Sequence, residues 1–320
     1  MTAPALRLEN LSKTFPLGRT LLGRERPGVR AVNPVTLDVI PGETLGIVGE
    51  SGCGKSTLAR MLVGLLEPTT GTIEIEGAAL DNADPAAFGK RIQYVFQDPI
   101  SSLNPRKTIR QIMEAPLRLL HGMGPSRRAA RIAEIFDAVS LREDFLDRYP
   151  HEFSGGQAQR IGIARALAAE PRILILDEPV SALDVSVQAQ VLNLLLDLKQ
   201  RFDLTYLFIS HDLAVVEAVS DRIVVLYFGS VVEIGPASDV FAAPAHPYTR
   251  LLADSAPVVG RPLKVPEAEG AELPDPLNPP PGCAFAARCP RATDKCRAEP
   301  LRLSSIREQS EVACFHPLSP

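Results

Sequence analysis

A glycine-rich loop near the start of the chain has the composition of a phosphate cradle. Residues 49–57 read Gly-Glu-Ser-Gly-Cys-Gly-Lys-Ser-Thr and fit the pattern G-x-x-x-x-G-K-[ST]. Glycines let the backbone curl with its N–H groups inward, so a polyphosphate meets donors instead of bulky side chains. Lys55 is predicted to reach the β- and γ-phosphates, and the Ser56 hydroxyl to bind Mg²⁺. The residues expected to contact nucleotide are Gly49, Glu50, Ser51, Gly52, Cys53, Gly54, Lys55, Ser56 and Thr57.

Two adjacent carboxylates end an apolar run later in the chain, at Asp177 and Glu178. At the end of a parallel strand beside a phosphate loop, Asp177 can hold Mg²⁺ through water. Glu178 follows where the chain turns and is placed to orient an attacking water. The loop and this carboxylate pair together predict nucleotide hydrolysis, but many ATPases and GTPases share both features.

Four of the five cysteines lie close together near the end of the chain, at Cys283, Cys289, Cys296 and Cys314. In a reducing compartment such a cluster suggests metal binding rather than disulfides. Four thiolates can close an iron–sulfur cluster or a structural zinc site. The spacing lacks the C-x₂₋₄-C pair typical of zinc, and Pro290 after Cys289 is similar to ferredoxin runs. Cys53 stands alone and is interpreted as a small filler in the phosphate loop.

Composition narrows the class of protein. A chain of 320 residues with 45% hydrophobic content is long enough for about two domains with their own cores. The net charge of −4 argues against a nucleic-acid partner. No stretch approaches the roughly 18 apolar residues that a membrane helix requires, and residues 1–5 do not begin a signal peptide. We therefore expect a cytosolic protein that reaches a membrane only through a partner.

The order of elements favours an α/β fold. Strands are expected over residues 5–11, 35–39, 43–48, 72–75, 92–96, 173–176 and 206–210, with a terminal hairpin over 223–227 and 230–234. Helices are expected over residues 55–66, 155–169, 187–202 and 213–219, with a helical insertion over 109–146. The basic run Arg19, Arg24, Arg26 and Arg30 is interpreted as a solvated loop.

Composition changes after residue 255, where prolines become frequent. The prolines concerned are Pro257, Pro262, Pro266, Pro274, Pro276, Pro279, Pro280 and Pro281. We place a domain boundary there. The tail that follows is too poor in apolar residues to hold a core unaided, so it needs a metal staple or a surface to lie on.

Between the two hydrolytic motifs, residues 153–157 read Phe-Ser-Gly-Gly-Gln, which resembles the signature motif of ATP-binding-cassette (ABC) proteins. The family's other motifs follow in register. Gln97 resembles the Q-loop glutamine, Asp184 ends a segment similar to the D-loop, His211 resembles the switch histidine, and Phe15 lies where an adenine-stacking aromatic usually falls. The resemblance implies a P-loop NTPase fold of the ABC type, with a RecA-like α/β core, an antiparallel β subdomain and a helical subdomain over about 106–168. It implies a cassette over 1–254 and a small cysteine-containing domain over 255–320.

The resemblance also implies that each ATP is bound by residues from two cassettes. Ser154, Gly155, Gly156 and Gln157 would bind the γ-phosphate of an ATP that the opposite subunit's P-loop holds. Physically, Ser154 is a good N-cap, and the glycines leave the first N–H groups of a helix uncovered.

The remaining roles follow the same resemblance. Glu178 would polarise the attacking water, and His211 would contact the γ-phosphate. Gln97 would couple nucleotide and Mg²⁺ to the helical insertion. Ala158 departs from the arginine common in the family, and we expect it to alter a surface contact only.

Two segments are similar to the oligopeptide/dipeptide importer group: residues 97–105, which begin at the Q-loop glutamine and resemble the group's Q-loop extension, and His246-Pro-Tyr-Thr249. Pro247 also suits the first turn of a helix. The group implies a [4Fe–4S] cluster on the four cysteines, with Zn²⁺ as the alternative. It implies a second, non-identical cassette subunit, two transmembrane permease subunits and an extracytoplasmic substrate-binding protein, with this chain peripheral on the cytoplasmic face of the inner membrane.

Other functions remain open from sequence. Related importers carry nickel chelates or glutathione instead of peptides. A non-transport ABC ATPase of translation or DNA repair usually has two cassettes or a coiled-coil insertion and basic surfaces, which this chain lacks. A P-loop regulatory protein without turnover would not need Glu178 and His211.

Overall fold

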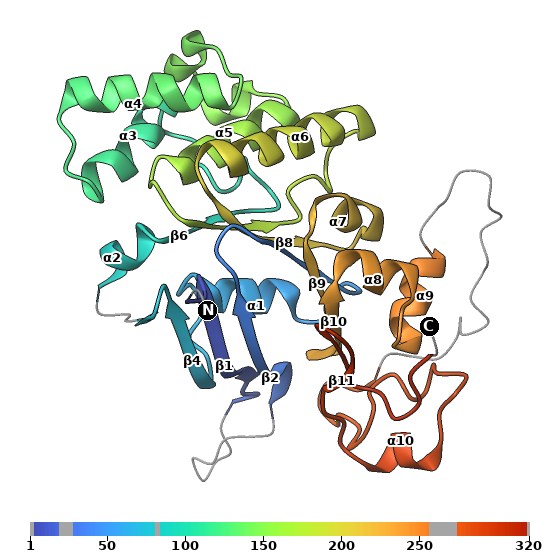
Figure 1. Cartoon of the computed structure of the whole chain (residues 1–320). Helices are drawn as coiled ribbons and strands as arrows, with labels where there is room; N and C mark the ends of the chain where they lie inside the picture. Colours follow the sequence, from blue (N-terminus) through green and yellow to red (C-terminus); the bar gives the residue numbers. More distant parts are fainter. Residues whose placement is uncertain (1–2, 19–27, 81–83, 256–273, 319–320) are drawn as a thin grey trace.

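A computed structural model describes residues 3–18, 28–80, 84–255 and 274–318. Arg19, Arg24 and Arg26 of the basic run lie outside the described residues, and so do Pro257, Pro262 and Pro266. Figure 1 shows a central sheet with a helical layer above it and a small second sheet below.

The central sheet holds the hydrolytic motifs at the ends of its strands. Its strand order is β11-β12-β10-β9-β3-β8-β7-β6, and β9, β3, β8, β7 and β6 run parallel. The bounds are β3 Thr44–Val48, β6 Ile92–Val95, β7 Ile173–Asp177, β8 Thr205–Ser210, β9 Arg222–Tyr227, β10 Ser230–Pro236, β11 Ser304–Arg307 and β12 Ser310–Val312. Every residue of β3, β7 and β8 is buried, as expected for parallel strands covered on both faces.

A second, antiparallel sheet lies beside the first helix. Its order is β2-β1-β4-β5, with bounds β1 Leu6–Phe15, β2 Val29–Val39, β4 Thr70–Ile75 and β5 Ala78–Ala79. Helix α1, Lys55–Leu62, packs between the two sheets, and its Leu58, Met61 and Leu62 are in one buried cluster with residues of β1 and β3. The expected antiparallel β subdomain is therefore present.

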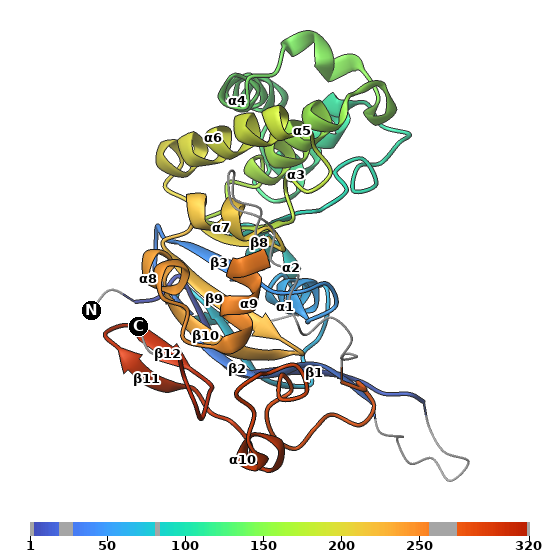
Figure 2. The same ribbon diagram turned by 90° about the vertical axis from the view of Figure 1, so that its right-hand side faces the viewer.

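The helical layer covers the opposite face of the central sheet (Figures 1 and 2). It contains α3 Ile109–Leu119, α4 Pro125–Ala138, α5 Gly155–Leu167 and α6 Val185–Arg201, with 3₁₀ turns Glu143–Asp147 and Pro150–Glu152. Helix α3 shows why these segments fold locally: Thr108 and Gln111 cap its start through reciprocal bonds of 3.1 and 3.4 Å. The remaining helices are α2 Pro85–Gly89, α7 Leu213–Val219, α8 Ala237–Ala242, α9 Pro247–Ser255 and α10 Asp294–Ala298.

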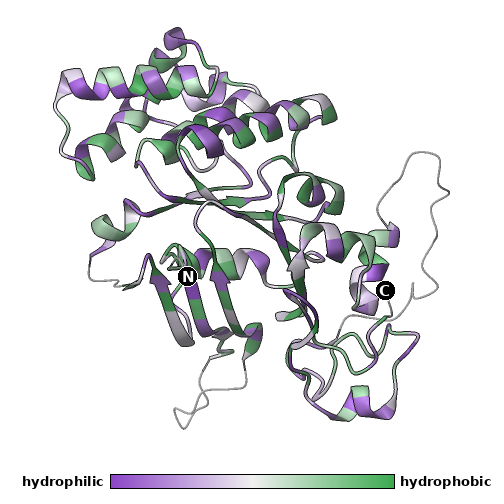
Figure 3. Ribbon diagram, viewed as in Figure 1, coloured by the Kyte–Doolittle hydropathy of each residue, from purple (hydrophilic) through white to green (hydrophobic). Residues whose placement is uncertain are grey.

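The tail, residues 274–318, lies on the preceding part of the chain and extends the central sheet. Strand β12 pairs antiparallel with β10, with Glu233 opposite Val312 and Ile234 opposite Glu311. Phe285 is only 2% exposed and belongs to the same buried cluster as the central sheet. Figure 3 shows the contrast in hydropathy: hydrophobic residues follow the central strands, whereas hydrophobic and hydrophilic residues are mixed along the tail. The expectation that the tail needs a surface to lie on is met by β10 and the residues around Phe285.

Candidate functional site

The phosphate-loop residues turn from β3 into α1 and curl as their glycines allow. Gly52 and Gly54 have φ of 77° and 105°. A Cβ on Gly54 would lie 2.3 Å from the carbonyl oxygen of Ala31 on β2, so only glycine fits against that strand. Gly54 caps α1 with no side chain in the way, which leaves the first N–H groups of the helix open to an anion.

Lys55 lies buried in the mouth of this loop. Its Nζ donates to the carbonyl oxygens of Gly49 at 2.7 Å and Glu50 at 3.0 Å. Cys53 Sγ is 3.8 Å from the same ammonium group, and burial raises the pKa of this thiol. Cys53 therefore stays a protonated filler, as its position in the loop suggested.

The carboxylate of Asp177 lies beside the loop at the end of β7. Ser56 Oγ donates to its Oδ1 at 3.3 Å, so an alcohol and a carboxylate oxygen face the same point. Hard oxygen donors of this kind suit Mg²⁺. Tyr94, on β6, donates its hydroxyl to Asp177 Oδ2. Burial and the charge of Asp177 raise the pKa of Tyr94, so the phenol stays protonated and donates.

Tyr94 is a site residue that sequence reasoning missed. Its position is set by the parallel pairing of β6 with β7, where Tyr94 lies opposite Ile175. A tyrosine one residue before a strand end carries no motif of its own. Only the pairing of strands far apart in the sequence brings its hydroxyl to Asp177.

Glu178 is the point at which three separate segments meet. Gln97 Nε2 donates to its Oε2 at 2.9 Å, and Nδ1 of His211 lies 3.1 Å from its Oε1. The backbone of Glu178 is left-handed, with φ of 48°, and its N–H donates to Ile209 on β8 at 2.8 Å. This turn directs the side chain away from that of Asp177, so the two carboxylates act on different partners.

The signature residues occupy the start of α5 in the helical layer. The N–H of Ser154 donates to Gln157 Oε1 at 3.1 Å, so these two residues cap the helix. Asp184 precedes α6, where its carbonyl oxygen accepts from the N–H of Val187 at 2.9 Å. In the part of the chain that the structure describes, no hydrogen bond or ion pair joins residues 154–157 or Asp184 to residues 49–57. One chain therefore assembles the loop, Asp177, Glu178, Gln97 and His211, but not the signature motif.

Phe15 and Ala158 differ in their exposure to solvent. Phe15 ends β1 with 40% of its surface exposed, and Lys13 Nζ lies over its ring, 5.4 Å from the centroid. Ala158 is fully buried, so the expectation that it alters a surface contact is wrong.

The four tail cysteines all line one small pocket. The other residues that line it include His246, Phe285 and Leu301. Within the described ranges, no group of three or more His, Cys, Asp or Glu side chains is close enough to hold one metal ion. Burial raises the pKa of Cys283 to about 11. His246 accepts the N–H of Tyr248 on Nδ1 at 3.0 Å, and burial lowers its pKa to about 4, so the ring is neutral.

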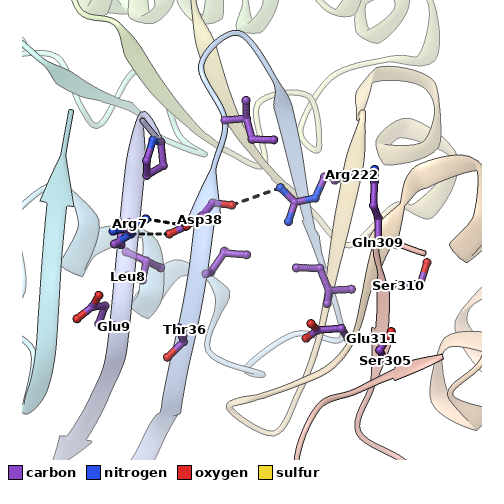
Figure 4. A pocket seen from close by; sticks show the side chains of 14 residues that line it. Arg7, Leu8, Glu9, Thr36, Asp38, Arg222, Ser305, Gln309, Ser310 and Glu311 are labelled. Atoms are coloured by element: carbon purple, nitrogen blue, oxygen red, sulfur yellow. Dashed lines mark hydrogen bonds and ion pairs between the residues drawn. The ribbon is translucent and has the colours of Figure 1, made fainter. Parts of the chain in front are cut away.

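A wide groove of about 940 Å³ separates β1 and β2 from the tail hairpin, and Figure 4 shows the side chains that line it. Three of its charged side chains are held by neighbours: Arg7 bonds both carboxylate oxygens of Asp38 at 3.0 and 3.2 Å, and Arg222 bonds the Asp38 carbonyl at 3.3 Å. The Arg7–Asp38 pair lies within the second sheet, and the Arg222–Asp38 contact joins that sheet to β9 of the central sheet. Among the described residues that line the groove, no set of hydrogen-bond donors converges on a point where a ligand could bind.

Helices long and apolar enough to span a bilayer are not found in the described residues.

Comparison with known proteins agrees with this geometry. Residues 32–181 match a family model described as "ABC transporter", and residues 232–296 match one described as "Oligopeptide/dipeptide transporter, C-terminal region". A probable peptide ABC transporter ATP-binding protein, y4tS of Sinorhizobium fredii, is 48% identical over 98% of this chain and 90% of its own length. The dipeptide transport ATP-binding protein DppF of Haemophilus influenzae is 44% identical over 98% of this chain and 97% of its own. The solved cassette MJ0796, in a dimeric post-hydrolysis state bound to ADP and Pi, aligns with a TM-score of 0.64 at 31% identity, over 72% of this chain and 98% of its own.

Proposed function

This chain belongs to the ABC transporter family, and from that membership we propose that it is the ATP-hydrolysing subunit of a peptide importer. The observation that carries the enzymatic part is the meeting of Gln97 and His211 at Glu178, next to Asp177, whose carboxylate accepts from Ser56 of the phosphate loop. The peptide part is supported by the match of the tail to the oligopeptide/dipeptide C-terminal region and by the names of the relatives. Nickel chelates or glutathione are the alternative cargoes.

In this proposal each side chain has a task that its position supports. The loop N–H groups and Lys55 bind the triphosphate, and Ser56 and Asp177 hold Mg²⁺, which neutralises charge on the phosphates. Glu178 orients the water that attacks the γ-phosphorus while the bond to the β–γ bridging oxygen breaks. His211 steadies the carboxylate and reaches the γ-phosphate, and Gln97 carries the state of the site to the helical layer.

A second cassette is required because the signature residues of one chain do not meet its own loop. We propose that Ser154–Gln157 and Asp184 contact the ATP held by a partner, a second and non-identical cassette subunit. The dimeric state of the MJ0796 cassette supports a paired arrangement. Two membrane-spanning permease subunits and an extracytoplasmic substrate-binding protein complete the importer, which holds this chain at the cytoplasmic face of the inner membrane. The cassette covers 1–254, with its helical subdomain at about 106–168, and the tail domain covers 255–320.

The dependence of ATPase rate on concentration tests this function. The purified chain is assayed with Mg²⁺ and ATP over a hundredfold range of concentration, alone and with each candidate partner cassette. We expect the rate per chain to rise with concentration or on addition of the partner. A constant rate per chain from a species that sedimentation shows to be monomeric would contradict the paired mechanism. Peptide uptake in cells with and without the gene tests the cargo.

We further propose that the four tail cysteines hold a [4Fe–4S] cluster. Support comes from their shared pocket, whose lining offers four thiols and no carboxylate. Such a group would link loops that have few apolar residues of their own, and Cys283, Cys289, Cys296 and Cys314 would be its ligands.

Iron and acid-labile sulfide analysis, with a visible spectrum of the anaerobically purified protein, tests the cluster. We expect about four iron and four sulfide per chain, lost in Cys289→Ser and kept in Cys53→Ser. Colourless protein with one zinc per chain would establish the alternative, and protein with neither would remove the metal.

A further inference from the structure

Glu50, the second residue of the phosphate loop, is held from the C-terminal tail. Arg288 donates through both terminal nitrogens to its carboxylate, each bond 2.9 Å long. The backbone N–H of the same residue donates to the hydroxyl of Tyr248 on α9, at 2.8 Å. Tyr248 and Arg288 lie 198 and 238 positions from Glu50 in the sequence. Together they fix the backbone and the side chain of this loop residue.

The Arg288–Glu50 ion pair is largely enclosed by packed side chains. The Arg288 side chain is 16% exposed and that of Glu50 30%. Its guanidinium lies 5.6 Å from the ring centroid of Phe285 and 5.9 Å from that of Tyr227. The Tyr248 ring packs against that of Tyr227 in a tilted arrangement, with centroids 4.5 Å apart. A bidentate arginine on aromatic faces loses little further freedom when it binds a carboxylate, so its geometry is well defined.

We propose that Arg288 and Tyr248 are positioning residues of the nucleotide site, through which the tail braces the phosphate loop. Both act through Glu50, which each of them contacts directly. The inference rests on the proposed ATP site and adds a residue set that none of the nucleotide-binding motifs includes.

The contacts of Arg288 and Tyr248 with Glu50, called the brace from here on, affect ATP binding in two ways. The carbonyl oxygen of Glu50 is one of the two that hold the Lys55 ammonium, so a shift of this residue moves the lysine that must reach the phosphates. In addition, the Glu50 carboxylate adds negative charge next to a triphosphate site, and Arg288 offsets that charge. The hydrogen bonds to Glu50 strongly favour the charged form of Arg288, whose pKa is raised by this pairing.

Arg288 lies directly before Cys289, so the brace also connects the cysteine pocket with the phosphate loop. Phe285 lies in the same short loop after Cys283 and packs edge-on against Tyr227, with centroids 5.3 Å apart. A displacement of this loop would therefore move the guanidinium and release Glu50.

Calorimetric titration of the full chain with MgADP tests the proposal. Arg288→Ala is expected to weaken MgADP binding by about three- to tenfold, which is the size of a partly exposed ion pair acting on a nearby site. The affinity of Arg288→Lys for MgADP should lie between those of the wild type and Arg288→Ala, because lysine keeps the charge and loses the bidentate geometry. Arg297→Ala is the matched control, since that arginine lies in the same tail and, among the described residues, forms its ion pair with the exposed Asp294.

A double-mutant cycle separates this role from a general loss of structure. If Arg288 acts through Glu50, then Arg288→Ala in a Glu50→Gln background should cause less than half of its effect in the wild-type background. The ATPase KM should rise more than kcat falls. Equal losses in both backgrounds, or unchanged MgADP binding in a folded Arg288→Ala protein, would overturn the proposal. Failure of the wild-type chain to bind MgADP would instead count against the proposed function.

Discussion

Glu178 shows how much of the chemistry depends on one backbone torsion angle. Its φ of 48° is unusual for a residue with a side chain, and its N–H is held by β8. Asp177 and Glu178 are adjacent in sequence, yet one faces Ser56 and the other Gln97 and His211. The pair of carboxylates and the turn that separates them were predicted from sequence; the structure adds the left-handed torsion angle by which the separation is achieved.

Replacing Glu178 by Gln keeps the shape of the side chain and removes its charge. We expect ATP binding within about threefold of wild type and a fall in kcat of about 10²- to 10⁴-fold, the range for loss of a general base or water-orienting carboxylate. Trapped nucleotide measured by filter binding and phosphate release give the two quantities. Glu217→Gln, on the exposed side of α7, is the control and should not change either. ATPase activity near wild type in Glu178→Gln would remove this residue from the mechanism.

Tyr94 gives a second test at the scale of single atoms. Its hydroxyl holds Asp177 Oδ2, so that Oδ1 faces Ser56. Tyr94→Phe should raise the Mg²⁺ concentration for half-maximal ATPase activity by about tenfold, because a hydrogen bond to a charged group contributes about 1.5–3 kcal/mol. Tyr206→Phe is the matched control: its hydroxyl donates to the Leu195 carbonyl at 2.9 Å, in the core and away from Mg²⁺. Equal Mg²⁺ dependence in the two variants would contradict the role of Tyr94.

At the scale of elements, regular periodicity predicted the central strands well. Helix 213–219 was predicted with the observed bounds, and the strand predicted at 173–176 extends by one residue to Asp177. The helix predicted to reach residue 66 ends at Leu62, and the insertion predicted as helical over 109–146 is broken after Leu119 and Ala138. Gly122 and Gly124, which lie between α3 and α4, explain the first break, because glycine disfavours helix.

Helix α5 starts against α6, and this contact explains one signature glycine. A Cβ on Gly156 would lie 2.6 Å from Cγ1 of Val187, while a Cβ on Gly155 would be 3.4 Å from Leu183. Gly156→Ala should therefore reduce the free energy of unfolding by about 1–3 kcal/mol, and Gly155→Ala by less. Urea denaturation measures both. Adding Val187→Ala should restore part of the stability lost in Gly156→Ala; no recovery would show that the strain lies elsewhere.

The tail is the part of the molecule that sequence described least well. Its strands β11 and β12 are short, and nothing in their composition indicates that they pair with β10. The need for a supporting surface was predictable from the lack of apolar residues. The identity of that surface was not, because it depends on contacts such as Phe285 with Tyr227 and Tyr248 across long separations.

Since the tail shares a sheet and a buried cluster with the cassette, we expect the two to unfold together. Phe285 is the residue that tests this at the scale of the whole molecule, because its ring packs between Tyr227, Tyr248 and His246. Phe285→Ala should lower the free energy of unfolding by about 3–5 kcal/mol, as for large aromatic side chains removed from a core. Phe315→Ala, a half-buried phenylalanine of the same tail, should cost clearly less.

Limited proteolysis followed by mass spectrometry separates joint unfolding from loss of the tail alone. In the Phe285→Ala protein, cleavage within 284–318 and within the cassette should become faster by the same factor, because one cooperative unit opens. Rapid cleavage of the tail with an unchanged cassette would mean that the pairing of β12 with β10 contributes little to the fold. The brace on Glu50 would then have to be explained by Arg288 and Tyr248 alone.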